Sequence, residues 1–528
     1  MLRFITIIAL ITVLFSSCQN TGRIKEQLPV QPVNTENLKN TPLIFSTTVL
    51  EKASEAAKAF YAANNNTTVW INKTDRTALQ DAVSGAAADG LTPEEYNLNF
   101  LKEFEALTSI SEEEAMRYDL MMTEAFTTLS NHLFKGKLQP SGVYDDWALA
   151  PKKLDSGKLL TEALQNHNIT EVIDRCRPRH AIYSGLRKSL EQLSNLPDDS
   201  NIATVIITKP VTLKDTTAIM GVIKQRLAYW GDLDLVLSEG NVYDAATAGA
   251  VKKFQERHGI VADGVVNTRT ADALNFTRNQ RKEQVIANLE RWRWFPYDFG
   301  ERAIVINIPN YRLAVLENNT DTIQTYKVVV GKPERRTPIL YSTLNNLVIN
   351  PTWTVPPTIL KEDLTPSATK DRSYFANLNM KIYKNDEEVS AQEWDPAIAD
   401  HYRYVQGPGD HNSLGRIKFN FRNSYSVYLH DTNHKENFAK PYRALSSGCV
   451  RVQNPFKLAG YVLDKQEKGW TKDKIDEIVA TGETTNVNIQ KSIQVHQLYW
   501  TAWMDKGGLQ FRNDIYSLDK ILYNKLRS

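Results

Sequence analysis

Residues 304–315 read IVINIPNYRLAV, and this stretch decides the fold of the second half of the chain. Apolar residues occupy every second position on both sides of the Pro309-Asn310 turn, which is the spacing of β-strands with one buried face. A third strand is expected over 323–330, and the alternation returns at 417–421. We therefore expect a meander of antiparallel hairpins after residue 300.

Before residue 300 the apolar residues recur every three or four positions, as they do along one face of an α-helix. The spacing starts near Pro42 and is clear around 118–133 and 181–193. At roughly 100–200 residues per domain, 528 residues predict two to four domains. The prediction is a multidomain α+β chain, with an all-α scaffold over 42–210 that continues at 276–300 and a mostly β domain over 301–528.

The strand pattern is interrupted between about 352 and 415. Pro356, Pro357 and Pro408 fall in this stretch, together with several glycines. A long irregular insertion in a sheet domain usually serves as a lid or binding loop. We therefore expect a capping insert.

The first 18 residues have the composition of an export signal. A positive charge at Arg3 precedes an apolar run, residues 4–14, that is too short for a bilayer span of about 20 residues. Small residues then precede Cys18, and this order resembles the lipobox of bacterial lipoproteins, in which the cysteine is lipidated. An uncleaved membrane anchor is the alternative, and 19–41 has the composition of a linker. Both interpretations place the rest of the chain outside the cytoplasm.

The charge balance argues against a nucleic-acid partner. There are 63 Lys plus Arg against 61 Asp plus Glu, a net charge of +2, whereas a nucleic-acid binder needs a pronounced basic excess. Three cysteines cannot form a disulfide framework, so each is interpreted singly. Cys176 lies between arginines without a histidine motif, and we interpret it as structural.

Residues 211–275 form a smaller helical unit. One helix pattern stops at Gly231, a second begins at Asp244 as its N-cap, and a third follows Asp263-Gly264. The pair Phe254-Gln255, together with Asp263-Gly264, resembles the three-helix peptidoglycan-binding module of bacterial cell-wall enzymes. A helical packing insert explains the apolar positions but not this combination. The resemblance implies peptidoglycan as the ligand without indicating the contact residues.

A histidine and a cysteine are the candidate catalytic residues. Tyr428 and His430 share one face at the end of an expected strand over 425–430, opposite its apolar residues. Cys449 follows His430 by 19 positions and precedes a helix that Asn454-Pro455 opens as N-cap and first turn. A neighbouring imidazole can take the thiol proton and lower the thiol pKa from about 8.5 by several units, which makes a thiolate nucleophile.

The neighbours of Cys449 suit acyl transfer. Gly448 allows close backbone approach and exposed N–H groups, and one donor to an oxyanion is worth about 2.7–4 kcal/mol of barrier. Arg451 adds a cation suited to a carboxylate. From spacing alone, a buried structural cysteine with a surface histidine explains the pattern equally well.

The histidines also raise the question of a metal hydrolase. His430 and His434 are four apart, with His401 and His411 nearby, but no Glu follows the first histidine as the zincin pattern requires. We expect no metal and no other cofactor.

The strings His430-Asp431-Thr432 and 446–451 (SSGCVR) resemble the signature of L,D-transpeptidases with a YkuD-type catalytic domain. The stretches 330–338 and 350–357 are similar to the larger periplasmic branch of that family. The domain order is similar too: a helical scaffold, an embedded three-helix peptidoglycan-binding module and a catalytic domain with a capping insert. Ser447 is a departure, since many relatives carry histidine there.

The resemblance implies a reaction. Cys449 attacks the carbonyl before the terminal D-Ala of a peptidoglycan tetrapeptide stem, His430 is the general base, and the thioester passes to an amine of a neighbouring stem as a 3→3 cross-link. It further implies that Ser446, Ser447, Gly448 and Arg451 shape the pocket and that Tyr428 contacts the oxyanion or the substrate. Trp353 is a further candidate substrate contact, for which packing is an equal alternative. The partners are donor and acceptor stems, and the protein is lipid-anchored through Cys18 at the periplasmic face of a bacterial membrane.

Two alternatives stay open. An L,D-carboxypeptidase passes the same acyl-enzyme to water and releases D-Ala, so the sequence does not separate it from a cross-linking enzyme. A structural lipoprotein that only binds peptidoglycan needs neither Cys449 nor His430.

Overall fold

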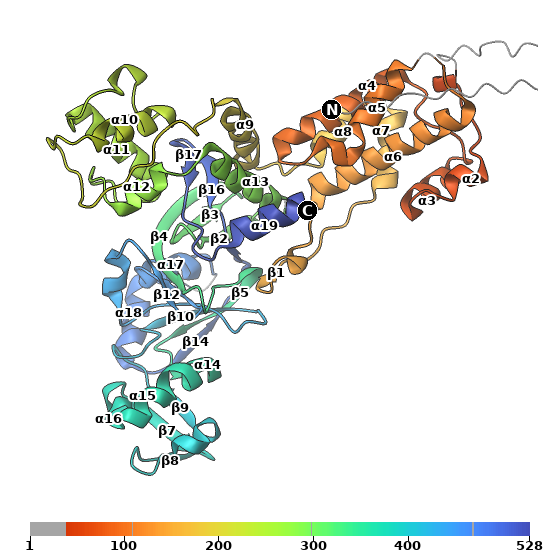
Figure 1. Cartoon of the computed structure of the whole chain (residues 1–528). Coiled ribbons are helices and arrows are strands. Elements are labelled where there is room, and N and C mark those ends of the chain that lie inside the picture. The colour runs from red at the N-terminus through yellow and green to blue at the C-terminus, as the bar shows by residue number, and fades with distance from the viewer. Residues whose placement is uncertain (1–37, 108, 297, 467–468) are drawn as a thin grey trace, which may run out of the picture.

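The computed structural model describes residues 38–107, 109–296, 298–466 and 469–528. The expected signal segment with its lipidation residue Cys18, and the linker up to residue 37, lie outside this part of the chain. Figure 1 shows the N-terminal helices, the small helical unit and the sheet with its insert as separate regions. Among the described helices, none combines the length and the apolar character that a membrane span needs.

The N-terminal helices have a core of their own. The long helix α6 (Glu112–Lys135) runs through its centre, and a capping box between Ser111 and Glu114 fixes where this helix begins. Tyr61, Trp70 and Phe126 are buried in this core. The other elements are α2 (Thr47–Leu50), α3 (Glu55–Ala63), α4 (Lys73–Gly85), η1 (Ala86–Asp89), η2 (Pro93–Tyr96), α5 (Leu98–Ala106), α7 (Ser156–Gln165) and α8 (Ile169–Arg175).

Three elements from the helical half pack with the sheet. The short strand β1 (Trp147–Ala148) pairs in parallel with β5 (Ile339–Ile349). Helix α9 (Ala181–Asn195) places Tyr183 and Leu186 in the same core as the strands. Helix α13 (Arg278–Trp294) is buried along most of its length and lies against α9 and the C-terminal helix α19 (Leu518–Arg527), so it joins the regions.

The small unit consists of three helices, α10 (Ile219–Tyr229), α11 (Ala245–Arg257) and α12 (Thr268–Leu274). Asp244 caps α11 as expected, because its side chain accepts the Thr247 N–H. The buried Gln255 explains the motif: its Nε2 donates to the Val265 carbonyl at 2.9 Å and its Oε1 accepts the Gly264 N–H at 2.9 Å. The motif residues therefore hold the Asp263-Gly264 turn in place.

The large sheet is mixed, so the prediction of an antiparallel meander was only partly right. Strands β2 to β4 form the expected hairpins, but β11 pairs in parallel with β13, β12 with β4 and β15 with β2. Parallel pairs need crossover connections. Helices α17 (Pro455–Asp464) and α18 (Lys472–Thr481) lie in the connection that leads from β13 to the last strands.

The strands run in the order β1-β5-β10-β11-β13-β4-β3-β2-β15, with β12 beside β4 and β14 beside β5. Their bounds are β2 (Arg302–Asn307), β3 (Arg312–Glu317), β4 (Asp321–Gly331), β10 (Ile417–Phe421), β11 (Leu429–His430), β12 (Ala444–Ser446), β13 (Val450–Val452), β14 (Thr485–Asn488) and β15 (Gln494–Leu498). A separate hairpin of β16 (Ala502–Asp505) and β17 (Gly508–Phe511) precedes α19.

The insert is a folded unit, and the expectation of an irregular segment was wrong. Its strands are too short for the alternation to show in the sequence, but Phe375, Trp394 and Tyr404 give it a core. In Figure 1 it lies at the end of the sheet far from the N-terminal helices. Its elements are β6 (Trp353–Thr354), α14 (Pro357–Ile359), the π-helix η5 (Leu360–Leu364), α15 (Thr365–Lys370), α16 (Ser373–Asn377), β7 (Met380–Lys384), β8 (Glu387–Val389), η6 (Pro396–His401) and β9 (Arg403–Gln406).

Candidate active site

A cavity of about 640 Å³ lies between the sheet and the insert. All eight pocket residues predicted from the sequence line it: Trp353, Tyr428, His430, Ser446, Ser447, Gly448, Cys449 and Arg451. Trp353 and the turn from Pro356 to Ile359 come from the insert, so the insert forms one wall of the cavity.

The strand that carries His430 is shorter than expected. Ser426 has φ +56°, and the Asn423 side chain accepts the N–H groups of Tyr425 and Val427, so residues before Leu429 form a turn. The predicted faces hold in part: Leu429 is buried in the core while Tyr428 and His430 line the cavity, but Tyr425 and Val427, expected on the core face, line the cavity as well.

Strand pairing sets the neighbours of Cys449. In the parallel register of β11 and β13, Leu429 pairs with Val450 and His430 with Arg451. The Val450 N–H donates to the Tyr428 carbonyl at 3.1 Å. Tyr428 therefore lies beside Cys449, and His430 lies one step further along the same strand.

The Cys449 thiol has a raised pKa, contrary to the expectation of a lowered one. Burial is the largest cause, and a hydrogen bond from Tyr428 and the charges of Lys418 and Arg451 oppose it. Because burial outweighs the favourable contacts, the resting side chain is a neutral thiol.

His430 is a neutral imidazole at physiological pH. Burial, followed by the charge of Arg451, lowers its pKa to about 3. Its Nδ1 atom is buried and has no hydrogen-bond partner within the residues the structure describes. No hydrogen bond joins it to Cys449 there either, although catalytic hydrogen bonds often tighten only when substrate binds. Nδ1 is therefore the buried ring nitrogen that has no partner within the described residues.

Tyr428 and Lys418 complete the surroundings of the thiol. The Tyr428 hydroxyl forms hydrogen bonds with Cys449 and Trp353. Lys418 Nζ lies 4.0 Å from the centroid of the Tyr428 ring, and Lys418 pairs with His430 across β10 and β11. Sequence reasoning did not identify Lys418 as a site residue, although it alternates with the buried Ile417 and Phe419 and therefore belongs on the His430 face.

The loop before Cys449 is fixed by its own side chains. Gly448 has φ +110°, and its N–H donates to Ser446 Oγ at 3.3 Å. The expectation that this N–H is exposed was therefore wrong. Ser446 Oγ in turn donates to the Cys449 carbonyl at 2.6 Å. The Cys449 N–H has no partner in the described part of the chain and is the remaining candidate oxyanion donor.

Thr337 and Tyr516 hold this loop from behind and were missed as functional residues. Thr337 Oγ1 donates to the Gly448 carbonyl at 2.8 Å and accepts the Gly331 N–H at 2.8 Å. The Tyr516 hydroxyl donates to the Gly331 carbonyl at 2.6 Å and accepts the Thr337 N–H at 3.1 Å. Thr337 lies in the stretch 330–338 that resembles the family, which was the available signal for this residue.

Arg335 connects the insert to the catalytic loop. Its guanidinium donates to Ser447 Oγ at 2.9 Å and pairs with Glu362 and with Asp363 of η5, the latter at 2.5 Å. Arg335 also lowers the pKa of Asp363. Many relatives carry a histidine at the position of Ser447. In this chain the serine at that position is held by the hydrogen bond from Arg335.

Two further expectations concern the capping of α17 and a metal site. Asn454 occupies the N-cap position but its side chain makes no capping hydrogen bond, and its φ is +52°. His434 lines the cavity and pairs with Glu436 at 3.4 Å. Within the described ranges, no three His, Cys, Asp or Glu side chains gather as metal ligands.

Three family models match the chain in the predicted order. They are described as "Scaffold domain" over residues 55–190, "Putative peptidoglycan binding domain" over 219–274 and "L,D-transpeptidase catalytic domain", of the YkuD family, over 301–488. Residues 301–488, which include the insert and most strands of the large sheet, therefore match the YkuD family of L,D-transpeptidase catalytic domains.

A curated relative from Haemophilus influenzae is named "Putative L,D-transpeptidase" and is 37% identical over 246 residues, 45% of this chain. The match spans about half of the relative's length, 48%. Solved L,D-transpeptidases from Xylanimonas cellulosilytica and Stackebrandtia nassauensis are 14% and 12% identical, each covering 56% of this chain and 99% and 97% of their own, with TM-scores of 0.18 and 0.19.

Proposed function

We propose that this protein is an L,D-transpeptidase that forms 3→3 cross-links in peptidoglycan through a thioester on Cys449. One observation carries the proposal. A free thiol, a buried imidazole with an unpaired nitrogen and an unpaired backbone N–H line one cavity, in a chain that also matches a peptidoglycan-binding domain.

The first half of the reaction forms the acyl-enzyme. The Cys449 sulfur attacks the carbonyl carbon before the terminal D-Ala, and the thiol proton passes to His430. Because thiol and imidazole are both neutral at rest, proton transfer accompanies bond formation. The Cys449 N–H donates to the oxyanion. Collapse breaks the C–N bond, and D-Ala leaves with the proton from His430.

The second half transfers the acyl group. The amine of a neighbouring stem attacks the thioester carbonyl, His430 takes the amine proton, and the C–S bond breaks. The thiolate then recovers its proton from His430. Arg451 lines the cavity, and Lys418 packs on the ring of Tyr428 at its wall; both cations suit the carboxylates of the stem peptides.

The test incubates purified protein with disaccharide-tetrapeptide and identifies products by mass spectrometry. A 3→3 dimer with release of D-Ala supports the proposal, and Cys449→Ala should yield none. Tripeptide without dimer indicates an L,D-carboxypeptidase. Unchanged tetrapeptide indicates a protein that only binds peptidoglycan.

We further propose, from the sequence alone, that Cys18 carries a lipid and holds the protein at the periplasmic face of a membrane. Metabolic labelling with a palmitate analogue should mark the protein, and Cys18→Ala should abolish the label and release the protein from the membrane fraction. Labelling that survives the substitution would contradict the proposal.

A further inference from the structure

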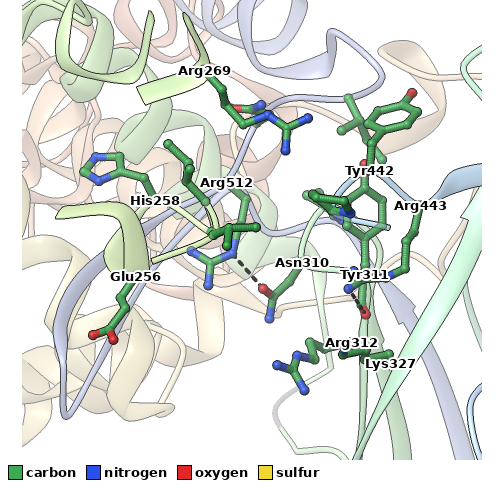
Figure 2. Close-up of a pocket in the computed structure, with 17 residues that line it drawn as sticks. Glu256, His258, Arg269, Asn310, Tyr311, Arg312, Lys327, Tyr442, Arg443 and Arg512 are labelled. Atoms are coloured by element: carbon green, nitrogen blue, oxygen red, sulfur yellow. Dashed lines mark hydrogen bonds between the residues drawn. The ribbon is translucent and has the colours of Figure 1, made fainter. Parts of the chain in front are cut away.

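A second cavity, of about 360 Å³, lies between the peptidoglycan-binding domain and the sheet (Figure 2). Arg269 of α12 reaches it from the binding domain. Arg312 of β3 and Lys327 of β4 line it from the sheet. Arg443, just before β12, and Arg512, just after β17, complete the group of five cations.

These five cations lack carboxylate partners. None of them forms an ion pair within the described part of the chain, and Glu256 is the one carboxylate among the lining residues. In Figure 2 the Glu256 carboxylate points away from the arginine side chains. Gathering like charges without counter-ions costs folding free energy, and a bound anion would offset that cost.

The cavity is preformed because two of the cations are fixed. Arg512 Nε donates to Asn310 Oδ1 at 2.7 Å and its Nη1 donates to the Arg257 carbonyl at 3.1 Å. Arg257 donates in return to the Leu509 carbonyl at 3.0 Å, so the binding domain is clasped to the C-terminal hairpin. Arg443 donates to the Tyr311 carbonyl at 3.2 Å.

The other three cations are available to a ligand. No side-chain hydrogen bond or ion pair of Arg269, Arg312 or Lys327 is present among the described residues. Two fixed cations and three free cations in one cavity suit a ligand that carries more than one negative charge.

The second cavity is close to the catalytic one. Strand β4 carries Lys327 at one cavity and ends at Gly331, next to the turn that lines the other. Four strand residues span about 13 Å. The segment from Arg443 to Cys449 also runs from one cavity to the other. An extended peptide of four residues covers about the same distance.

We infer that this cavity is an anion site that holds the carboxylates of a peptidoglycan stem peptide while another stem lies at Cys449. The inference rests on the proposed function, since it assigns a second contact for the same polymer. The ligand class is a peptide with at least two carboxylates.

The experiment uses the full chain with Cys449→Ala, which binds without turnover, and titrates disaccharide-tetrapeptide by calorimetry. The double variant Arg269→Gln/Arg312→Gln should lose one equivalent of bound peptide, or bind it at least tenfold more weakly. A peptide whose carboxylates are amidated should not bind at the site that the double variant removes. Lys253→Gln, an exposed change on the same domain away from the cavity, is the matched control and should bind normally.

Equal stoichiometry and affinity in the double variant would overturn the inference, as would unchanged binding of the amidated peptide. Inorganic phosphate that binds this site more tightly than the peptide would overturn it as well. Acylation by a carbapenem, measured with Cys449 intact, distinguishes a failure of the anion site from a failure of the proposed function. The double variant should be acylated at the wild-type rate, whereas a failure of both proteins to react would count against the proposed function alone.

Discussion

Tyr428 lies opposite Cys449 on paired segments of the sheet, and its hydroxyl forms a hydrogen bond with the thiol. The contact lowers the pKa of a sulfur that burial otherwise raises. Tyr428 is therefore a group that prepares the nucleophile as well as a candidate substrate contact.

Replacement of Tyr428 by Phe should slow acylation. The variant keeps the ring that packs on Lys418 but loses the hydrogen bond, which is worth about 1 kcal/mol and corresponds to about a fivefold to tenfold lower rate near neutral pH. Stopped-flow acylation by a carbapenem measures it, with circular dichroism to verify the fold. An unchanged rate would show that the hydroxyl does not act on the sulfur.

The pH dependence of acylation should lack a histidine step near pH 6.5. The pKa of His430 is lowered to about 3, so the ring stays neutral and competent as a base down to mildly acidic pH. The pKa of Cys449 is raised, so alkylation by iodoacetamide should keep rising above the ordinary thiol pKa of about 8.5. A plateau of alkylation below pH 7 would instead indicate a preformed thiolate.

The lowered pKa of His430 also predicts that the folded state is sensitive to acid. Between about pH 3 and pH 6.5 the unfolded state binds a proton at His430 that the folded state does not. His430 therefore lowers the free energy of unfolding as the pH falls through that window. In His430→Asn the loss of melting temperature between pH 7 and pH 5 should be smaller. An identical loss in both proteins would contradict a neutral buried ring.

Arg335→Ala should loosen the insert without unfolding the chain. Partly exposed ion pairs contribute about 0–1 kcal/mol each, so the melting temperature should change little. Hydrogen exchange of residues 357–370 should nevertheless rise and KM should increase severalfold. Arg403→Ala removes an ion pair with Asp386 elsewhere in the insert and is the matched control. If the two variants behave alike, Arg335 has no special role in closing the cavity.

Thr337→Val should destabilise the loop that carries Cys449. It leaves the Gly448 carbonyl and the Gly331 N–H without a buried partner, at a cost of about 1–3 kcal/mol each. Urea unfolding measures the loss, and Thr369→Val, an exposed helical position, should show almost none. Equal stability of the two variants would contradict the bracing role.

Much of the candidate site could be predicted because its residues occupy short strings. His430, Cys449 and their neighbours lie on two segments, and the family resemblance put both in one pocket. Lys418 follows from strand alternation. The contact of Thr337 with Gly448 could not be predicted, since 111 residues separate the partners. Likewise β1, two residues long, exists only through its pairing with β5.

The account depends most directly on an acyl group bound to sulfur. Protein quenched in acid during turnover of disaccharide-tetrapeptide should carry an adduct of the substrate mass less D-Ala, and peptide mapping should place it on Cys449. Cys449→Ser, which keeps the shape of the side chain, should carry far less. An adduct on another residue, or none in a protein that still forms product, would contradict the account.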